Sequence, residues 1–130
     1  MSIKAYLAEC VAIDFYGNGG FRFADMSHTG SMLILPNGMH GWHPVSFEDI
    51  TPDDFKPLFD TVTASTFVLF GTGSKQQWPG RELKTAFARR NIALEVMDTG
   101  AAVRTYNVLL GEHRPVAAAL LAVASHKSHD

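Results

Sequence analysis

The fold is decided by the stretch Phe67-Val-Leu-Phe-Gly71-Thr-Gly73, by Pro79-Gly80 after it, and by the segment from Val96 to Leu110. Short apolar runs bounded by Gly and Pro alternate here with segments of helical period, in the order strand, loop, helix, strand, helix. Strands of a parallel βαβ unit are covered on both faces, so they form continuous apolar runs. This stretch therefore predicts an α/β domain.

The length and composition of the chain predict one domain without a polyanionic partner. A chain of 130 residues with 46% hydrophobic content buries roughly two-thirds of its unfolded surface in a single core. We expect one α/β domain over residues 1–124 and a polar, disordered tail over residues 125–130. The net charge of −2 gives no field that gathers nucleic acid or anionic lipid.

Cysteine use and hydropathy favour a cytoplasmic protein. Cys10 is the single cysteine, so it forms no internal disulfide, which fits a reduced compartment. We expect Cys10 to be a small core residue. The longest apolar run, from Val116 to Ala124, is about half the length that spans a bilayer, so no transmembrane segment is expected. The N-terminus shows no signal-peptide pattern.

The N-terminal third predicts a hairpin, a strand and a loop. Apolar segments 10–15 and 21–24 flank Tyr16-Gly-Asn-Gly-Gly20, a glycine-rich stretch that suits a tight turn. Ser31 to Leu35 is predicted as a strand that Pro36-Asn-Gly38 ends. The segment from Met39 to Val45 has neither strand nor helix period, so we expect a loop. Its His40, Trp42 and His43 form a candidate partner-binding loop, with Trp42 as its anchor on the sheet.

The middle and end of the chain predict helices alternating with strands. Thr51 is a candidate N-cap for a helix with Pro52 in its first turn, and Pro57 predicts that this helix is split or kinked. The remaining expected elements follow in order: a central strand at 66–70, a helix at 81–90, a strand at 92–97, a helix at about 100–112 capped by Thr99, and an ambiguous segment 115–122. Alanine content alone favours helix for the last segment.

A resemblance resolves that ambiguity. Gly71-Thr-Gly73, Asn91 to Thr99, Ala102 to Leu110 and Glu112 to Leu121 resemble a family of small domains of unknown function. That family includes a methanogen hypothetical protein and the third assembly factor of mitochondrial respiratory complex I. The resemblance also covers Asp14-Phe-Tyr-Gly17, Gly30 to Pro36 and Trp42, and thus nearly the whole chain.

The resemblance implies a particular fold and a protein partner. It implies a three-layer α/β domain with a mixed, mostly parallel central sheet, preceded by an N-terminal β-hairpin region. Residues 115–122 become the last, antiparallel strand. The implied partner is a respiratory-complex subunit or assembly protein. Family members commonly carry Cys where this chain has Val103, and a pair such as Gly-Arg around His113 and Pro115. A thiol-dependent activity at that position would be absent here.

Two groups of residues form the candidate ligand- or partner-binding site. Open α/β sheets bind ligands at the carboxyl ends of their strands, where this chain has Gly71, Thr72 and Gly73, then Asp98 and Thr99. The third glycine of a dinucleotide-binding loop is missing.

The second group lies on the helix at 100–112. Arg104 and Asn107 share one face with Gly100 and Gly111. They either bind a ligand or partner, or satisfy neighbouring groups within the fold, with Arg104 paired to Asp98 or Glu112.

The sequence favours a binding or assembly module over an enzyme. It contains no nucleophile with its base, no complete phosphate-binding loop and no set of metal ligands, since His40 and His43 stand without a further close pair. We therefore expect no metal and no cofactor. The alternative is a small-molecule or anion-binding protein, or a weak enzyme, with its site at the carboxyl ends of the central strands.

Overall fold

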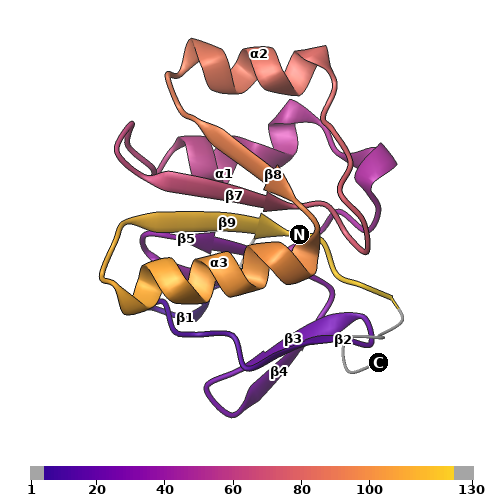
Figure 1. Ribbon diagram of the computed structural model, residues 1–130, viewed down its shortest axis with the longest axis vertical. Coiled ribbons are helices and arrows are strands. Elements are labelled where there is room, and N and C mark those ends of the chain that lie inside the picture. The colour runs from indigo at the N-terminus through magenta and orange to yellow at the C-terminus, as the bar shows by residue number, and fades with distance from the viewer. Residues whose placement is uncertain (1–4, 125–130) are drawn as a thin grey trace.

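The structure, a computed structural model, describes residues 5–124 and shows a three-layer arrangement around a central sheet (Figure 1). In spatial order, the six strands of this sheet are β1 (Ala5–Leu7), β6 (Gly38–Trp42), β5 (Ser31–Leu35), β9 (Val116–Leu120), β7 (Phe67–Gly71) and β8 (Leu94–Met97). A three-stranded antiparallel sheet is formed by β2 (Phe15–Gly17), β3 (Gly20–Phe23) and β4 (Met26–Thr29).

Helices cover both faces of the central sheet. Helix α3 (Thr99–Gly111) lies on one face, where it shares a core with side chains of the small sheet. The other face is covered by α1 (Lys56–Phe59), α2 (Arg81–Arg89) and the 3₁₀ turns η1 (Phe47–Asp49) and η2 (Pro52–Phe55). The predicted α/β class, with its mixed sheet and N-terminal hairpin region, is confirmed.

The strand directions correct one detail of that prediction. Strand β7 is parallel to β8 and β9, whereas the pairings of β1 with β6, β6 with β5, and β5 with β9 are antiparallel. The sheet is therefore not mostly parallel, and β9 is antiparallel to β5 alone. Strand β9 is parallel to β7 because helix α3 forms a crossover connection between β8 and β9. Two strands that are joined by such a crossover run in the same direction.

The glycine-rich turn in the N-terminal third forms the predicted hairpin, although its first strand is Phe15–Gly17 and not the expected segment 10–15. Asn18 and Gly19 have φ of 52° and 80°, and they connect Gly17 to its cross-strand partner Gly20. Positive φ at both central residues of a two-residue loop gives a turn whose twist matches that of the strands. The turn is also fixed to the end of the chain, because Gly19 N donates to Val123 O at 2.7 Å.

The expected loop from Met39 to Val45 is wrong over its first half, which is strand β6. This strand pairs with β5 on one side and β1 on the other. Met39, His40 and Trp42 are all buried, so the strand lacks the apolar and polar alternation that marks a half-exposed strand. A strand covered on both faces gives no period-two signal.

The interrupted helix after Thr51 is confirmed. The chain forms a 3₁₀ turn, η2, and then a single α-helical turn, α1, in which Pro57 lies in the first turn. Thr51 N donates to the carboxylate of Asp54 at 2.8 Å, which satisfies an amide at the start of the turn. Phe55 and Leu58 are fully buried against the sheet.

Helix α3 begins one residue earlier than expected, and its cap is Asp98 rather than Thr99. The Asp98 carboxylate accepts a hydrogen bond from Ala101 N at 2.8 Å, as an N-cap side chain does. Ala102, Val103 and Tyr106 are buried and form the core face of the helix. The expected disorder of residues 125–130 lies outside the described residues.

Strand β9 is an interior strand despite its alanines. Ala117, Ala118 and Ala119 have no exposed surface. Ala118 belongs to the core beneath α3, whereas Ala117 and Ala119 belong to the core beneath α1 and α2. Pairing on both sides and coverage on both faces override the helix propensity of alanine, which is a weak local preference.

We expect Ala118→Pro to prevent folding. Ala118 is paired with Ile34 and Leu69 at the centre of the sheet, and proline removes the backbone donor that an interior strand needs. Ala118→Gly keeps the backbone N–H group and should lower the free energy of unfolding by only about 1 kcal/mol. This variant therefore separates the effect of losing the backbone hydrogen bond from the effect of losing the side chain. In the wild type, hydrogen exchange should be slowest at the amides of β9. A folded proline variant would contradict the interior placement.

Candidate functional site

The predicted residues at the carboxyl ends of β7 and β8 do lie together, at the start of α3. Gly73 N donates to the hydroxyl of Thr99 at 2.9 Å. A Cβ atom at Gly71 would lie 3.0 Å from the Cα of Thr99, so a glycine permits the close approach of strand and helix. The strand ends are therefore joined by direct packing of β7 against α3.

The two threonine hydroxyls of the candidate site are engaged in the fold. Thr99 is fully buried and donates to Leu121 O at 2.7 Å. Thr72 donates to Lys75 O at 2.7 Å and accepts from Gln77 N at 3.0 Å. Each hydroxyl thus satisfies backbone groups of a connecting segment, which fixes the loop after β7 and the chain after β9.

Asn107 holds the segment that leads into the small sheet. Its amide oxygen accepts from Ile13 N and its amide nitrogen donates to Ile13 O, both at 2.9 Å. The hydroxyl of the preceding residue, Tyr106, donates to Val11 O at 2.8 Å. Asparagine here satisfies a donor and an acceptor of one residue, so it serves the folded structure.

The single cysteine lies in the same region and is not an activated thiol. Cys10 is half-buried, and its Sγ donates to Leu35 O at 3.1 Å. Burial raises the pKa of the Cys10 thiol, and burial also raises the pKa of the neighbouring Tyr106. A nucleophilic cysteine needs a lowered pKa, so the interpretation of Cys10 as a small core residue agrees with its surroundings.

Arg104 is the exception among the predicted site residues. Its side chain is exposed and makes no hydrogen bond or ion pair with any other residue between 5 and 124. The expected pairing with Asp98 or Glu112 is absent from this range, because Asp98 caps α3 and Glu112 lies 3.7 Å from Arg114. Arg104 lies beside Gly100, where the hydroxyl of Tyr16 packs closely on the helix.

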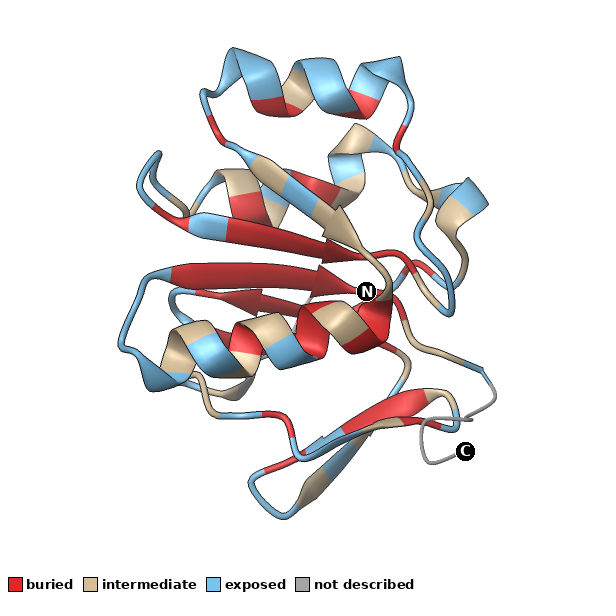
Figure 2. Ribbon diagram, in the orientation of Figure 1, coloured by how far each residue is buried: buried red, intermediate tan, exposed pale blue. Residues whose placement is uncertain are grey.

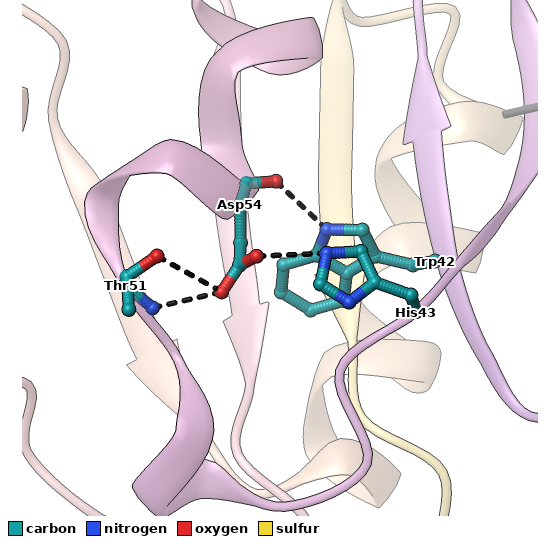
Figure 3. A network of polar contacts seen from close by, with 4 residues as sticks. All are labelled: Trp42, His43, Thr51 and Asp54. Atoms are coloured by element: carbon teal, nitrogen blue, oxygen red, sulfur yellow. Dashed lines mark hydrogen bonds and ion pairs between the residues drawn. The ribbon is translucent and has the colours of Figure 1, made fainter. Parts of the chain in front are cut away.

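The aromatic and histidine residues of the candidate partner loop hold a turn in place. Trp42 Nε1 donates to Asp54 O at 2.8 Å, and His43 Nε2 lies 2.8 Å from the Asp54 carboxylate (Figure 3). The Trp42 ring is buried, with edge contacts to Phe55 and Phe70. Trp42 is an anchor that joins β6 to η2.

His40 is buried on β6 with one nitrogen unsatisfied. Its Nε2 lies 2.8 Å from Asn37 Oδ1, to which it donates in the Nε2–H tautomer, and Nδ1 has no partner among residues 5–124. Burial lowers the pKa of His40, because the charged ring would lose its hydration. Within the described residues, His, Cys, Asp and Glu side chains form no group of three that suits a metal ion.

Three comparisons place the chain among known proteins. A family described as "Protein of unknown function (DUF498/DUF598)" matches residues 13–121. The chain is 31% identical over 92% of its length to mouse NADH dehydrogenase (ubiquinone) 1 alpha subcomplex assembly factor 3. It spans about three-fifths of the length of the curated relatives it matches, 64% for the mouse protein.

Solved structures with the same fold come from bacteria. A crystal structure titled as an outer membrane protein from Bartonella henselae is 42% identical, with a TM-score of 0.83 over 91% of this chain and 99% of that one. The NMR structure of the Rpa2829 protein from Rhodopseudomonas palustris is 43% identical, with a TM-score of 0.76 over 95% and 89% of the two chains. No helix within residues 5–124 has the length and apolar character needed to cross a membrane.

Substitution of Asn107 and of Arg104 should have different effects on stability. Asn107→Ala leaves the amide and carbonyl of Ile13 without partners and should lower the free energy of unfolding by about 1–3 kcal/mol. Arg104→Ala should change it by less than about 1 kcal/mol, because the side chain is exposed and unpaired. Urea denaturation measures both, with exposed Val108→Ala as the control. Equal losses would make Arg104 a structural residue.

Stability should fall with acid through His40. The unfolded chain has a histidine pKa of about 6.5, and burial lowers the pKa of His40 in the folded state. The unfolded state therefore binds more protons below about pH 6.5, and stability is lost as pH falls through this window. We expect His40→Gln to lose less stability than the wild type between about pH 7.5 and 5.5, measured by urea midpoints. Identical pH slopes would exclude a contribution from His40.

Proposed function

The chain belongs to the family of proteins of unknown function DUF498/DUF598, and from this membership we propose that it is a non-catalytic module that assists assembly of a protein complex. Its curated relatives in mouse and human are named as assembly factors of NADH dehydrogenase (ubiquinone). We propose that its partner is a respiratory-complex subunit or a protein that assembles one.

The hydrogen bonding of the candidate site supports this proposal. Thr72, Thr99 and Asn107 satisfy backbone groups inside the fold, and Asp98 caps α3. Catalysis of acyl, phosphoryl or proton transfer needs polar groups that converge on a substrate with free donors or acceptors. A site whose hydroxyls, amide and carboxylate hold the fold together supports a binding surface better than a reaction centre.

The remaining free group of that site gives the module a point of contact. Arg104 is always charged, and its planar fork matches a carboxylate or a phosphate with two hydrogen bonds. We propose that Arg104 contacts the partner, while Gly71, Thr72, Gly73, Asp98, Thr99 and Asn107 hold the surface around it. The exposed His43 ring next to Asp54 belongs to the same proposal as a second contact, on the other face of the sheet.

We propose a cytoplasmic location, supported by the single unpaired cysteine. The similar Bartonella henselae protein is titled as an outer membrane protein, so cell fractionation of the native host distinguishes the two locations. Recovery in the membrane fraction after a high-salt wash would contradict the cytoplasmic assignment.

Capture from the native host tests the assembly role. A tagged wild-type chain should enrich a subunit or assembly protein of a respiratory complex over the tag alone, identified by mass spectrometry. Arg104→Ala should reduce this enrichment without loss of stability, and Val108→Ala should not. A thermal-shift screen of metabolites runs in parallel. A saturable shift of several degrees with one metabolite, and no enriched protein, would favour the small-molecule alternative.

A further inference from the structure

Strand β8 is an open edge of the central sheet. It is the last strand in the spatial order, and its only strand partner among the described residues is β7. Thr72 N donates to Met97 O at 2.9 Å, so the N–H and C=O groups of Met97 and Glu95 face β7. Backbone groups alternate in direction along a strand, and those of Leu94 and Val96 therefore point outward.

The open edge is covered by one side-chain hydrogen bond. Gln76 Nε2 donates to Val96 O at 2.8 Å, and Gln76 is exposed. No backbone hydrogen bond joins Leu94 or Val96 to any segment other than β7 within residues 5–124. An incoming strand would therefore displace one exposed side chain to reach the outward donors and acceptors of β8.

An apolar groove lies beside this edge, on the face that α2 covers. Its volume is about 240 Å³, and its lining includes Trp78, Phe87 and Ile92 beside Leu94 and Val96 of the strand. Trp78 is 67% exposed, a large apolar side chain left uncovered next to unpaired backbone groups. Figure 2 shows β8 as intermediate or exposed, whereas β7 is almost entirely buried. Backbone and groove together offer the two components of strand recognition.

The charge of Glu95 favours one kind of strand at the open edge of β8. The side chain of Glu95 is exposed and makes no ion pair or hydrogen bond with residues 5–124. If two copies joined by antiparallel pairing centred on Glu95, each Glu95 would face the other directly. Like charges in directly opposed positions destabilise a strand pair, and opposite charges stabilise it. A second copy is therefore disfavoured in this register, and a strand with Lys or Arg opposite Glu95 is favoured.

We propose that an extended segment of the assembly partner adds to β8 as a seventh strand, with two apolar side chains in the Trp78 groove and a basic residue between them opposite Glu95. This inference rests on the proposed function, because it names the surface at which the module holds its partner. The alternation of apolar, basic and apolar residues follows from the two faces of a strand. Main-chain hydrogen bonds give affinity, and the groove and Glu95 give specificity.

Hydrogen exchange on the complex of the chain with its captured and identified partner tests the pairing. In the free chain, the amides of Leu94 and Val96 should exchange much faster than those of Glu95 and Met97, which face β7. Binding should slow Leu94 and Val96 by at least about tenfold. Unchanged exchange at both amides in the saturated complex would overturn the proposal.

Three variants test the groove, the charge and the outward donor. Trp78→Ala, Glu95→Lys and Val96→Pro should each weaken partner binding by about tenfold or more, a change of about 1.4 kcal/mol. Proline at 96 removes an outward donor and leaves the bonds to β7 in place. Glu95→Lys alters an exposed side chain, so it keeps the test valid if the proline variant does not fold. Val108→Ala, on α3, should bind as the wild type does.

The possible outcomes separate the inference from the proposed function. Capture of the partner that is unaffected by all three variants overturns the β8 surface and leaves the assembly role intact. Failure of the wild type to enrich any protein removes the assembly role and the inference with it. Light scattering tests whether a second copy of the chain occupies the edge of β8. A wild-type dimer that Val96→Pro dissociates would assign the edge to a second copy and overturn the proposal.

Discussion

The structure depends on the pairing of β9 between β5 and β7. This strand joins an antiparallel half of the sheet, which the N-terminal part of the chain forms, to a parallel half formed by β7 and β8. Both faces of β9 are also buried, by α3 on one side and by the aromatic core around Phe55 and Phe70 on the other. Ala117 to Ala119 keep the strand thin, so both layers pack closely against it.

Local sequence patterns predicted the elements whose surroundings agree with their propensities. The apolar run of β7, the amphipathic α2 and the core face of α3 all follow from period and composition. Local patterns gave no strand at β1 or β4, and they also missed two interior strands of the central sheet, β6 and β9. Their burial on both faces removes the period-two pattern, and alanine in β9 favours helix when isolated. For β9, only the family resemblance supplied the assignment.

The sequence predicted where the candidate site lies, but not which of its polar side chains are already hydrogen-bonded within the fold. Strand order places Gly71 to Gly73 and Asp98 at one end of the sheet, and general rules for α/β sheets locate this end from sequence. Which groups stay free depends on partners distant along the chain. Thr99 bonds to Leu121, and Asn107 bonds to Ile13. Tyr16, which packs on Gly100, has no sequence signal that connects it with α3.

These long-range bonds bear directly on how the molecule meets other proteins. Side chains that satisfy backbone groups across the fold make the loops at the carboxyl ends of β7 and β8 rigid, and they leave few free polar side chains there. Backbone groups of the sheet that stay unpaired within the described residues then lie at the outer edge of β8, one of the two edges of the sheet. Edge strands in monomers are usually protected by charge or by covering segments. Here Glu95 opposes self-pairing, while Trp78 leaves apolar surface for a different chain. A fold that uses its side chains for rigidity thus presents main-chain groups for recognition, and the selectivity for a partner rests on the few exposed residues that flank them.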